Sequence, residues 1–424
     1  MLITLVFIIG YLAIVFEHPL KVNKTATALI TGVLCWVLYG LSEGDSDLVS
    51  SQLVHYLGEI SGILFFLLGA MAIVELIDAH DGFDIITAKI KTTSERKLLW
   101  TVSLLTFFMS ALLDNLTTTI IMISLLRKLV PTPRRRMLFA GTVIIAANAG
   151  GAWSPIGDVT TTMLWIGGQI TALNIVLKLF LPSIVCMLIP VAFLSFKMKG
   201  RIDRADTIPA PEKISASPFE QNLILGLGIA AMLFVPVFKM LTGLPPFMGI
   251  LFSLGFLWLV TEIIHKEKGE KEKDMYSAAR ALSRIDVPSV LFFLGILVAI
   301  SALESTGKLS ALASFMNDKI GNISVIAIVI GLLSAVVDNV PLVAATMGMY
   351  DLSIFPTDHY FWEFIAYTSG TGGSCLVLGS AAGVTAMGME KMDFIWYLKR
   401  FSLLALAGYF AGALVYMAQH SLLG

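Results

Sequence analysis

The chain has 424 residues; 57% of them are hydrophobic, only 14% are charged, and the formal net charge is −1 at pH 7. Soluble domains usually carry about 25% charged residues, so this composition excludes an ordinary soluble protein. Nothing in the charge pattern predicts nucleic-acid binding. Apolar stretches recur along the whole length, and each could cross a hydrocarbon core of roughly 30 Å as a helix. Because they lack the alternation of a transmembrane barrel, the sequence predicts an all-α membrane protein.

The apolar segments fall near residues 2–17, 25–42, 60–78, 98–126, 137–165, 171–197, 221–241, 246–264, 288–304, 322–350, 361–390 and 395–420. The first lacks a positively charged n-region, so it is predicted to be a membrane span and not a cleaved signal. Six connections contain 25 of the 29 Lys and Arg residues: 18–24, 79–97, 127–136, 197–218, 265–287 and 391–400. The positive-inside rule assigns them to the cytoplasm. Both termini are then predicted to lie outside the cytoplasm.

The segment 98–126 has basic connections on both sides, so it must enter and leave the membrane from the cytoplasm. Two full crossings would need about 40 residues, which this segment does not have. It therefore predicts a re-entrant helical hairpin with its tip near Ser110–Asn115. The segment 322–350 predicts a second hairpin that enters from outside, with its tip near Ser334–Asn339.

The segments 137–165 and 361–390 are too long for one span and contain Gly, Ser and Pro runs, so each predicts a span that is broken in the middle. Three blocks recur at nearly constant offsets of 222 to 227 residues: Ser110–Asn115 with Ser334–Asn339, Leu64–Phe66 with Leu291–Phe293, and Gly150–Gly151 with Gly372–Gly373. A steady offset indicates an internal duplication.

The duplication divides the chain into a first repeat at 1–198 and a second at 220–424, joined by a cytoplasmic linker at 199–219. Each repeat is predicted to hold about five transmembrane helices, one re-entrant hairpin and one broken helix. An odd number of spans inverts the second repeat relative to the first. Inverted repeats with broken segments at matching positions indicate the binding site of a secondary transporter.

Asp114 and Asp338, at the two hairpin tips, are the predicted ion-binding residues. A carboxylate inside a bilayer is costly unless it is paired or hydrated, and burial raises an Asp pKa towards neutral pH. The same oxygens can hold a hard cation instead of a proton. A site that binds either ion, but not both, carries the minimal chemistry of an antiporter.

Neutral oxygen ligands are predicted around the two aspartates: Asn115, Thr117, Thr118, Asn148, Ser154, Asn339, Ser369, Thr371 and Ser374. Asp158 is either a second titrating acid or only an N-cap for the half-helix that follows it. The Asp-Asn pairs could be simple turn residues, and Gly150–Gly151 and Gly372–Gly373 could serve helix packing. The matching positions of the two Asp-Asn pairs favour the ion-binding interpretation.

The sequence from Ser334 to Tyr350, which reads Ser-Ala-Val-Val-Asp-Asn-Val-Pro and onwards, strongly resembles the NhaD-type sodium/proton antiporters. These belong to the ion transporter superfamily, which also includes arsenite permeases and sodium-dicarboxylate symporters. Ser110–Met122 and Asn148–Thr162 resemble the companion blocks, and the resemblance covers essentially the whole chain. It implies a homodimer in the bacterial inner membrane that exchanges Na⁺, and Li⁺ as well, for H⁺. It also implies a scaffold that holds a mobile transport part, with Na⁺ bound by Asp114, Asn115, Asp338 and Asn339.

Several other functions stay open at this point. An arsenite or oxyanion exporter is one alternative, for which Cys375 beside the second broken span is weak support. A sodium-coupled organic-anion symporter is another, and it would need an Arg or Lys facing the cavity. An intramembrane aspartyl protease is disfavoured by the absence of its sequence patterns, so no enzyme is predicted. The chain has no ATP-binding loop and no clustered cysteines, so no cofactor is predicted and an ion gradient must supply the energy.

Overall fold

The computed structural model describes residues 2–90, 92–198, 200–202 and 216–423, and within them the protein is helical, with no β-strand. The helices before the gap at 203–215 are α1 (Leu2–Val15), α2 (Glu17–Leu20), α3 (Lys24–Glu43), α4 (Ser46–Ala79), α5 (Gly82–Ala88), α6 (Glu95–Leu113), α7 (Asn115–Leu129), α8 (Pro133–Ala152), α9 (Val159–Ile166) and α10 (Ala172–Lys197). Most of the predicted linker 199–219 lies outside the described residues.

The α-helices after the gap are α11 (Pro218–Thr242), α12 (Pro246–Ile264), α13 (Glu270–Met275), α14 (Ala278–Leu282), α15 (Val287–Ser305), α16 (Lys308–Ile320), α17 (Ile323–Leu333), α18 (Asn339–Met349), α19 (Tyr360–Gly372), α20 (Ala381–Glu390), α21 (Phe394–Tyr397) and α22 (Leu403–Leu423). A short 3-10 turn, Val377–Gly379, precedes α20, and a π-helical turn, Leu398–Ser402, precedes α22.

Eight helices of the described chain are long and apolar enough to cross a membrane, and a ninth span results if the sharply bent pair α16 and α17 is counted as one. The sequence predicts five spans in each half. The numbers differ because α8 and α19 break at residues 153–158 and 373–380, which leaves pieces too short to count alone. The first helix is also short, with 14 residues.

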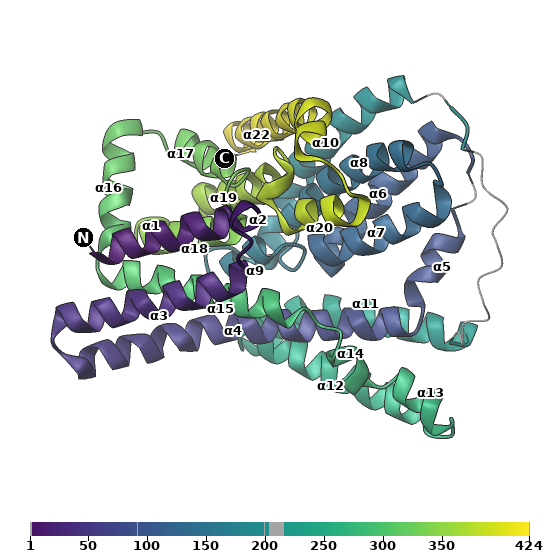
Figure 1. Cartoon of the computed structure of the whole chain (residues 1–424), viewed down its shortest axis with the longest axis horizontal. Coiled ribbons are helices and arrows are strands. Elements are labelled where there is room, and N and C mark those ends of the chain that lie inside the picture. The colour runs from purple at the N-terminus through teal and green to yellow at the C-terminus, as the bar shows by residue number, and fades with distance from the viewer. Residues whose placement is uncertain (1, 91, 199, 203–215, 424) are drawn as a thin grey trace.

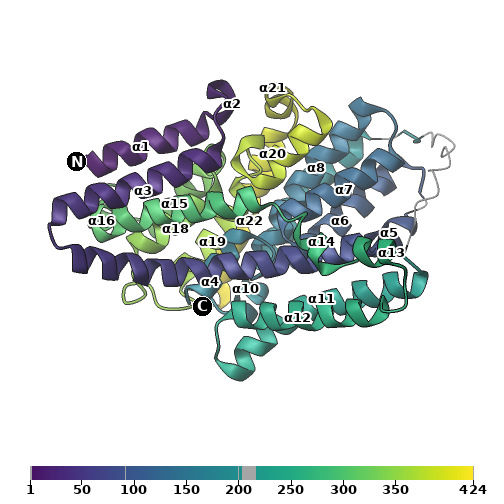
Figure 2. The ribbon, with the colours of Figure 1, turned by 60° about the horizontal axis from the view of Figure 1, so that its bottom comes forward.

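The helices form two groups. Figure 1 shows α3, α4, α11, α12 and α15 along one edge of the molecule. With α1, these helices pack against one another and form what we call the α4 layer. The other group, here the α8 bundle, contains α6 to α10, α17 to α20 and α22. Figure 2 shows α4 running along most of the length of the molecule. The layer and the bundle meet where α15 contacts α18 and α4 contacts α9.

The centre of the α8 bundle is α8 itself. All fourteen residues of this helix from Phe139 to Ala152 are buried. A helix that is apolar on all sides must be surrounded by protein or lipid, and here α6, α7, α10, α19 and α20 surround it. The bundle therefore buries the broken end of α8, where the predicted polar residues lie.

Polar caps fix where several helices begin. Asn23 accepts a hydrogen bond from the Thr25 amide at 2.8 Å at the start of α3, and Asp45 caps α4 in the same way. Ser217 and Glu220 form a reciprocal capping box at the start of α11. Such caps satisfy backbone amides that have no partner within the helix.

A buried carboxylate ties three parts of the α8 bundle together. Glu390, the last residue of α20, has a fully buried carboxylate that accepts hydrogen bonds from Arg127 Nε at 2.9 Å and Arg136 Nε at 2.6 Å. Arg127 lies near the end of α7 and Arg136 in the first turn of α8.

Replacing Glu390 with Gln is expected to destabilise the protein by about 3 kcal/mol, because it leaves a largely buried Arg136 without its charge partner. The measurement is the thermal unfolding midpoint of the purified variant in detergent. Glu43→Gln, at an exposed helix end, is the matched control. Equal midpoints for the two variants would contradict the role of this ion-pair cluster.

A second polar cluster lies where α4, α11 and α12 end or begin. His80 follows α4, His265 follows α12, and their Nε2 atoms are 2.8 Å apart. His80 Nδ1 lies 2.7 Å from the Leu76 carbonyl, so it must donate, and its Nε2 accepts from His265. His265 Nδ1 is then left without a hydrogen-bond partner among the described residues, 3.8 Å from Glu220 Oε1. Lys268 pairs with the same Glu220 oxygen at 2.8 Å.

Burial, together with the nearby charge of Lys268, lowers the pKa of His265 from 6.5 to about 4. The unfolded chain takes up this proton near pH 6.5 and the folded protein does not, so stability is lost as the pH falls from 6.5 towards 4. We expect His265→Gln to flatten the decline of the unfolding midpoint over this range. His55→Gln, at an exposed position of α4, should keep the wild-type slope. Equal slopes for wild type and His265→Gln would disprove this assignment.

Candidate ion-binding site

One cavity, with a volume of about 70 Å³, brings together residues from both halves of the chain. Its lining includes three acids, Asp114, Asp158 and Asp338, and the amides Asn115 and Asn339. The first two acids come from the first half and the third from the second half. The sequence analysis predicts both hairpin-tip aspartates here, and the structure places them on the same cavity as Asp158.

Asp114 lies at the break between α6 and α7. Its backbone φ of 73° is in the left-handed region, which aspartate adopts more readily than most residues. The carboxylate caps α7, because Oδ1 accepts from the Thr117 amide at 2.8 Å and Oδ2 accepts from the Thr117 hydroxyl at 2.9 Å. The predicted partner Thr117 thus acts by holding the carboxylate at the helix N-terminus, where the helix dipole favours negative charge.

Asp158 caps α9, where the broken helix resumes. Its Oδ1 accepts from the Thr160 amide at 2.8 Å and from the Thr160 hydroxyl at 2.6 Å. The other oxygen, Oδ2, accepts from Asn115 Nδ2 at 2.5 Å. The residue is therefore an N-cap and also lines the cavity, so the two interpretations of Asp158 describe one side chain.

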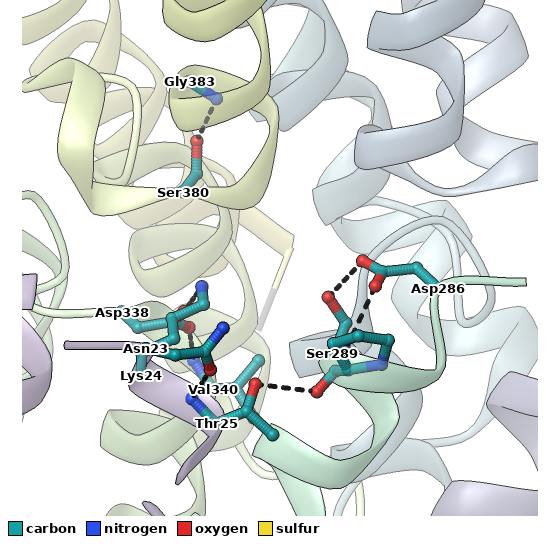
Figure 3. Close-up of polar contacts among 10 residues, drawn as sticks. Asn23, Lys24, Thr25, Asp286, Ser289, Asp338, Val340, Ser380 and Gly383 are labelled. Carbon is teal, nitrogen blue, oxygen red and sulfur yellow. Dashed lines mark hydrogen bonds and ion pairs between the residues drawn. The ribbon is translucent and has the colours of Figure 1, made fainter. Parts of the chain in front are cut away.

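A hydrogen-bonded chain connects the two halves at this cavity. Asn115 Nδ2 also donates to Asn148 Oδ1 at 3.1 Å, and Asn148 Nδ2 donates to Ser380 Oγ at 2.9 Å. Ser380 caps α20 by accepting from the Gly383 amide, as Figure 3 shows. All three linking residues are buried, so the chain fixes the first hairpin tip against both broken helices.

Asp338 precedes α18 and has a different environment. Its Oδ1 accepts from the Val340 amide at 3.1 Å, and its Oδ2 lies 4.0 Å from Lys24 Nζ (Figure 3). Lys24 is the first residue of α3 and also lines the cavity. The sequence analysis finds no cation at the hairpin tips and places Lys24 in a cytoplasmic connection.

The other predicted ligands fall into two classes. The Thr118 hydroxyl is fully buried and has no hydrogen-bond partner among the described residues. Ser154 donates to the Ala111 carbonyl at 2.5 Å and so holds the first hairpin against the α8 break. Three further hydroxyls donate to backbone carbonyls of α19 and are not among the residues that line the cavity: Ser369, Thr371 and Ser374.

Sequence reasoning missed Ser380 and Lys24. Ser380 could have been found, because the 222-residue offset that pairs Gly150 with Gly372 also pairs Asp158 with Ser380. Lys24 gave no such signal, because the basic pattern of connection 18–24 already explains it.

Two glycines allow the helices around the site to approach closely. A Cβ on Gly150 would lie 2.2 Å from the Phe107 carbonyl oxygen, and one on Gly372 would lie 1.9 Å from that of Gly331. Real Cβ atoms do not come this close to backbone oxygens, so no side chain fits at either position. The two contacts are equivalent, because Phe107 and Gly331 are 224 residues apart, the offset that relates the two hairpins.

Larger cavities lie on either side of the site. One of about 620 Å³ reaches Thr117 and shares Met71 and Leu116 with the site cavity. Its polar lining is mostly acidic, with Glu75, Asp78, Asp81, Asp84 and Asp286 beside Lys128 and Arg284. The other, of about 530 Å³, includes Glu59, Glu304 and Asp351. Its described lining shares no residue with the site cavity.

This arrangement suits a small cation. The described residues contain no group of three or more His, Cys, Asp or Glu close enough to hold one metal ion, so the three carboxylates do not converge on a single point. Each has its own neutral oxygen or amide neighbours instead. Carboxylate, amide and hydroxyl oxygens are the ligands that hard cations prefer.

The helices and the polar cavity define a multi-pass membrane transporter. The sequence profile of the citrate transporter family, CitMHS, matches residues 11–372, and the chain belongs to this family. Sodium/proton antiporter 1 of Arabidopsis thaliana is 51% identical over 420 residues, which cover 99% of this chain and 72% of the relative. The Na⁺/H⁺ antiporter NhaD of Alkalimonas amylolytica is 30% identical over 444 residues, covering 97% and 89%. The Vibrio cholerae NhaD antiporter is 30% identical over 420 residues, covering 93% and 87%. The predicted resemblance to NhaD-type antiporters is thus confirmed.

Proposed function

We propose that this protein exchanges Na⁺ for H⁺ across a membrane, with Asp114, Asp158 and Asp338 as the groups that carry the ions. The observation that carries the proposal is the position of all three acids on one small cavity. A carboxylate cannot hold a proton and a sodium ion on the same oxygens, so binding of one ion releases the other. The names of the relatives, sodium/proton antiporters from a plant and from bacteria, support the same exchange.

The size and charge of the cavity argue against an organic anion. Pockets for small organic molecules have volumes of about 300–1,000 Å³, whereas this one has about 70 Å³. Three carboxylates would repel a dicarboxylate, and Lys24 supplies one positive charge against them. The family's description as citrate transporters therefore does not decide the substrate of this chain. Arsenite export has little support, because Cys375 is not among the residues that line the cavity.

We propose that the two halves are inverted repeats, with re-entrant hairpins at α6–α7 and α17–α18. Corresponding helices make corresponding contacts: α3 packs on α15 as α12 packs on α4, and α6 packs on α8 as α17 packs on α19. The matching approaches of Gly150 and Gly372 to carbonyl oxygens support the same relation. With the basic connections inside, the 620 Å³ cavity faces the cytoplasm and the 530 Å³ cavity faces outside.

In this proposal the α4 layer is the scaffold and the α8 bundle is the mobile transport part. The shared lining of the site cavity and the 620 Å³ cavity supports access to the ions from the cytoplasm in this conformation. Li⁺ is proposed as a second substrate, and a homodimer as the assembly. A bacterial inner membrane and external termini remain proposals, since the 51% identical relative is from a plant.

Proton release on sodium binding tests the exchange chemistry directly. Purified protein in weakly buffered detergent solution is titrated with NaCl, and a pH dye follows the solution, with choline chloride as the ionic-strength control. Competition predicts acidification that saturates with Na⁺ and is absent with choline. Equal responses to both salts would contradict competition at the carboxylates.

A further inference from the structure

Lys24 is the one cationic side chain among the described residues that line the site cavity. Its Nζ lies 4.0 Å from Asp338 Oδ2 and 4.7 Å from the centre of the Phe292 ring. Figure 3 shows Lys24 directed towards Asp338. Both side chains are about a quarter to a third exposed, so the pair is reached by solvent from the cavity.

The backbone of Lys24 is held by the α4 layer. Asn23 caps the helix, and the Thr25 hydroxyl donates to the Pro288 carbonyl at 3.0 Å, which joins the starts of α3 and α15. Further along, Trp36 Nε1 donates to the Val298 carbonyl at 2.9 Å. Asp338, in contrast, stands before α18 in the α8 bundle. The ion pair therefore crosses from one group of helices to the other.

Asp338 has fewer hydrogen-bond donors than the other two acids. Asp114 accepts from an amide and a hydroxyl of Thr117, and Asp158 accepts from Thr160 and Asn115. Asp338 accepts from the Val340 amide, and the Lys24 ammonium stands nearest its other oxygen. A sodium ion at that oxygen would compete with the ammonium, because two cations a few ångströms apart repel each other strongly where water is scarce.

We propose that the Lys24 ammonium is a tethered competitor of the transported cation. It stays beside Asp338 while that carboxylate carries no Na⁺, and it moves back over the Phe292 ring when Na⁺ binds. An aromatic face within about 6 Å attracts an ammonium group, so the ring gives the displaced charge a favourable place. This inference rests on the proposed function and adds to it a residue that sets the apparent Na⁺ affinity.

The test compares the Na⁺ concentration for half-maximal exchange in proteoliposomes that contain wild type, Lys24→Met or Lys24→Arg. Removing the competitor should lower this concentration about three- to tenfold, as expected for loss of one partly buried ion pair. Lys24→Arg keeps the charge and should not lower it. Lys197→Met is the matched control, because Lys197 also lies over an aromatic ring, that of Phe193, but at the end of α10 away from the cavity.

Sodium-dependent thermal stabilisation of the same purified variants gives a second readout that does not need transport. The midpoint of Lys24→Met should rise at lower Na⁺ concentrations than that of wild type. Lys24→Gln replaces it if Lys24→Met does not fold. An unchanged or raised half-maximal Na⁺ concentration in a folded neutral variant overturns the inference. Failure of wild type to respond to Na⁺ at all would instead overturn the proposed exchange.

Discussion

Replacing Asp114, Asp158 or Asp338 singly with Asn is expected to lower Na⁺-driven proton exchange by about 100-fold or more, the range measured when a proton-transferring group is removed. Asparagine keeps the shape of the side chain and one acceptor oxygen but cannot carry a proton between the two faces. The measurement is the initial rate of dye recovery in proteoliposomes with a preset pH gradient.

The control for this series is Asp47→Asn, because Asp47 is exposed at the start of α4 and far from the cavity lining. It should keep the wild-type rate. Each variant must also keep an unfolding midpoint near that of wild type, so that loss of exchange reports on the site. Near-normal exchange in folded Asp114→Asn and Asp338→Asn would show that the cavity is not the ion-binding site.

Replacing Gly372 with Val is expected to prevent correct folding of the second half. The Cβ alone would lie 1.9 Å from the Gly331 carbonyl oxygen, and backbone atoms of a packed helix cannot move aside cheaply. Overpacking a core typically costs 1–3 kcal/mol, and contact with backbone should reach or exceed the upper end, about 3 kcal/mol. Fluorescence-detected size-exclusion chromatography and the unfolding midpoint report the effect.

Gly226→Ala provides the matched control for Gly372→Val. Gly226 lies within α11, and a Cβ there would meet no atom within 4 Å. Alanine at such a helical position should stabilise the protein slightly, by about 0.4–1 kcal/mol. If Gly372→Val gave the same monodisperse peak and midpoint as Gly226→Ala, the close approach of α17 and α19 would be refuted.

The parts of the site predicted from sequence are those whose chemistry conflicts with a bilayer. Asp114 and Asp338 stand out because a carboxylate in an apolar segment is costly, and their equal positions in two matching blocks make chance unlikely as an explanation. The glycine runs at 150–151 and 372–373 predicted the two broken helices for the same reason. The structure interrupts both helices just after these glycines.

Residues that join the site from elsewhere in the chain were not predictable in this way. Lys24 lies beside Asp338 only because α3 packs along α15, and no local pattern encodes that distance. Ser369, Thr371 and Ser374 were predicted as ligands from their hydroxyls, but each satisfies a nearby carbonyl in or beside α19. A hydroxyl in a helix can bond to a carbonyl three or four residues earlier, so composition alone could not separate ligands from such residues.

The most direct test of the account is a cation-selective exchange assay on purified wild-type protein in proteoliposomes with an acidic interior and an enclosed pH dye. Na⁺, Li⁺, K⁺, citrate as its choline salt, or arsenite is added outside. The account predicts that Na⁺, and Li⁺ as well, collapse the pH gradient, and that citrate and arsenite do not. A gradient that survives every alkali cation but responds to citrate or arsenite would contradict sodium/proton exchange.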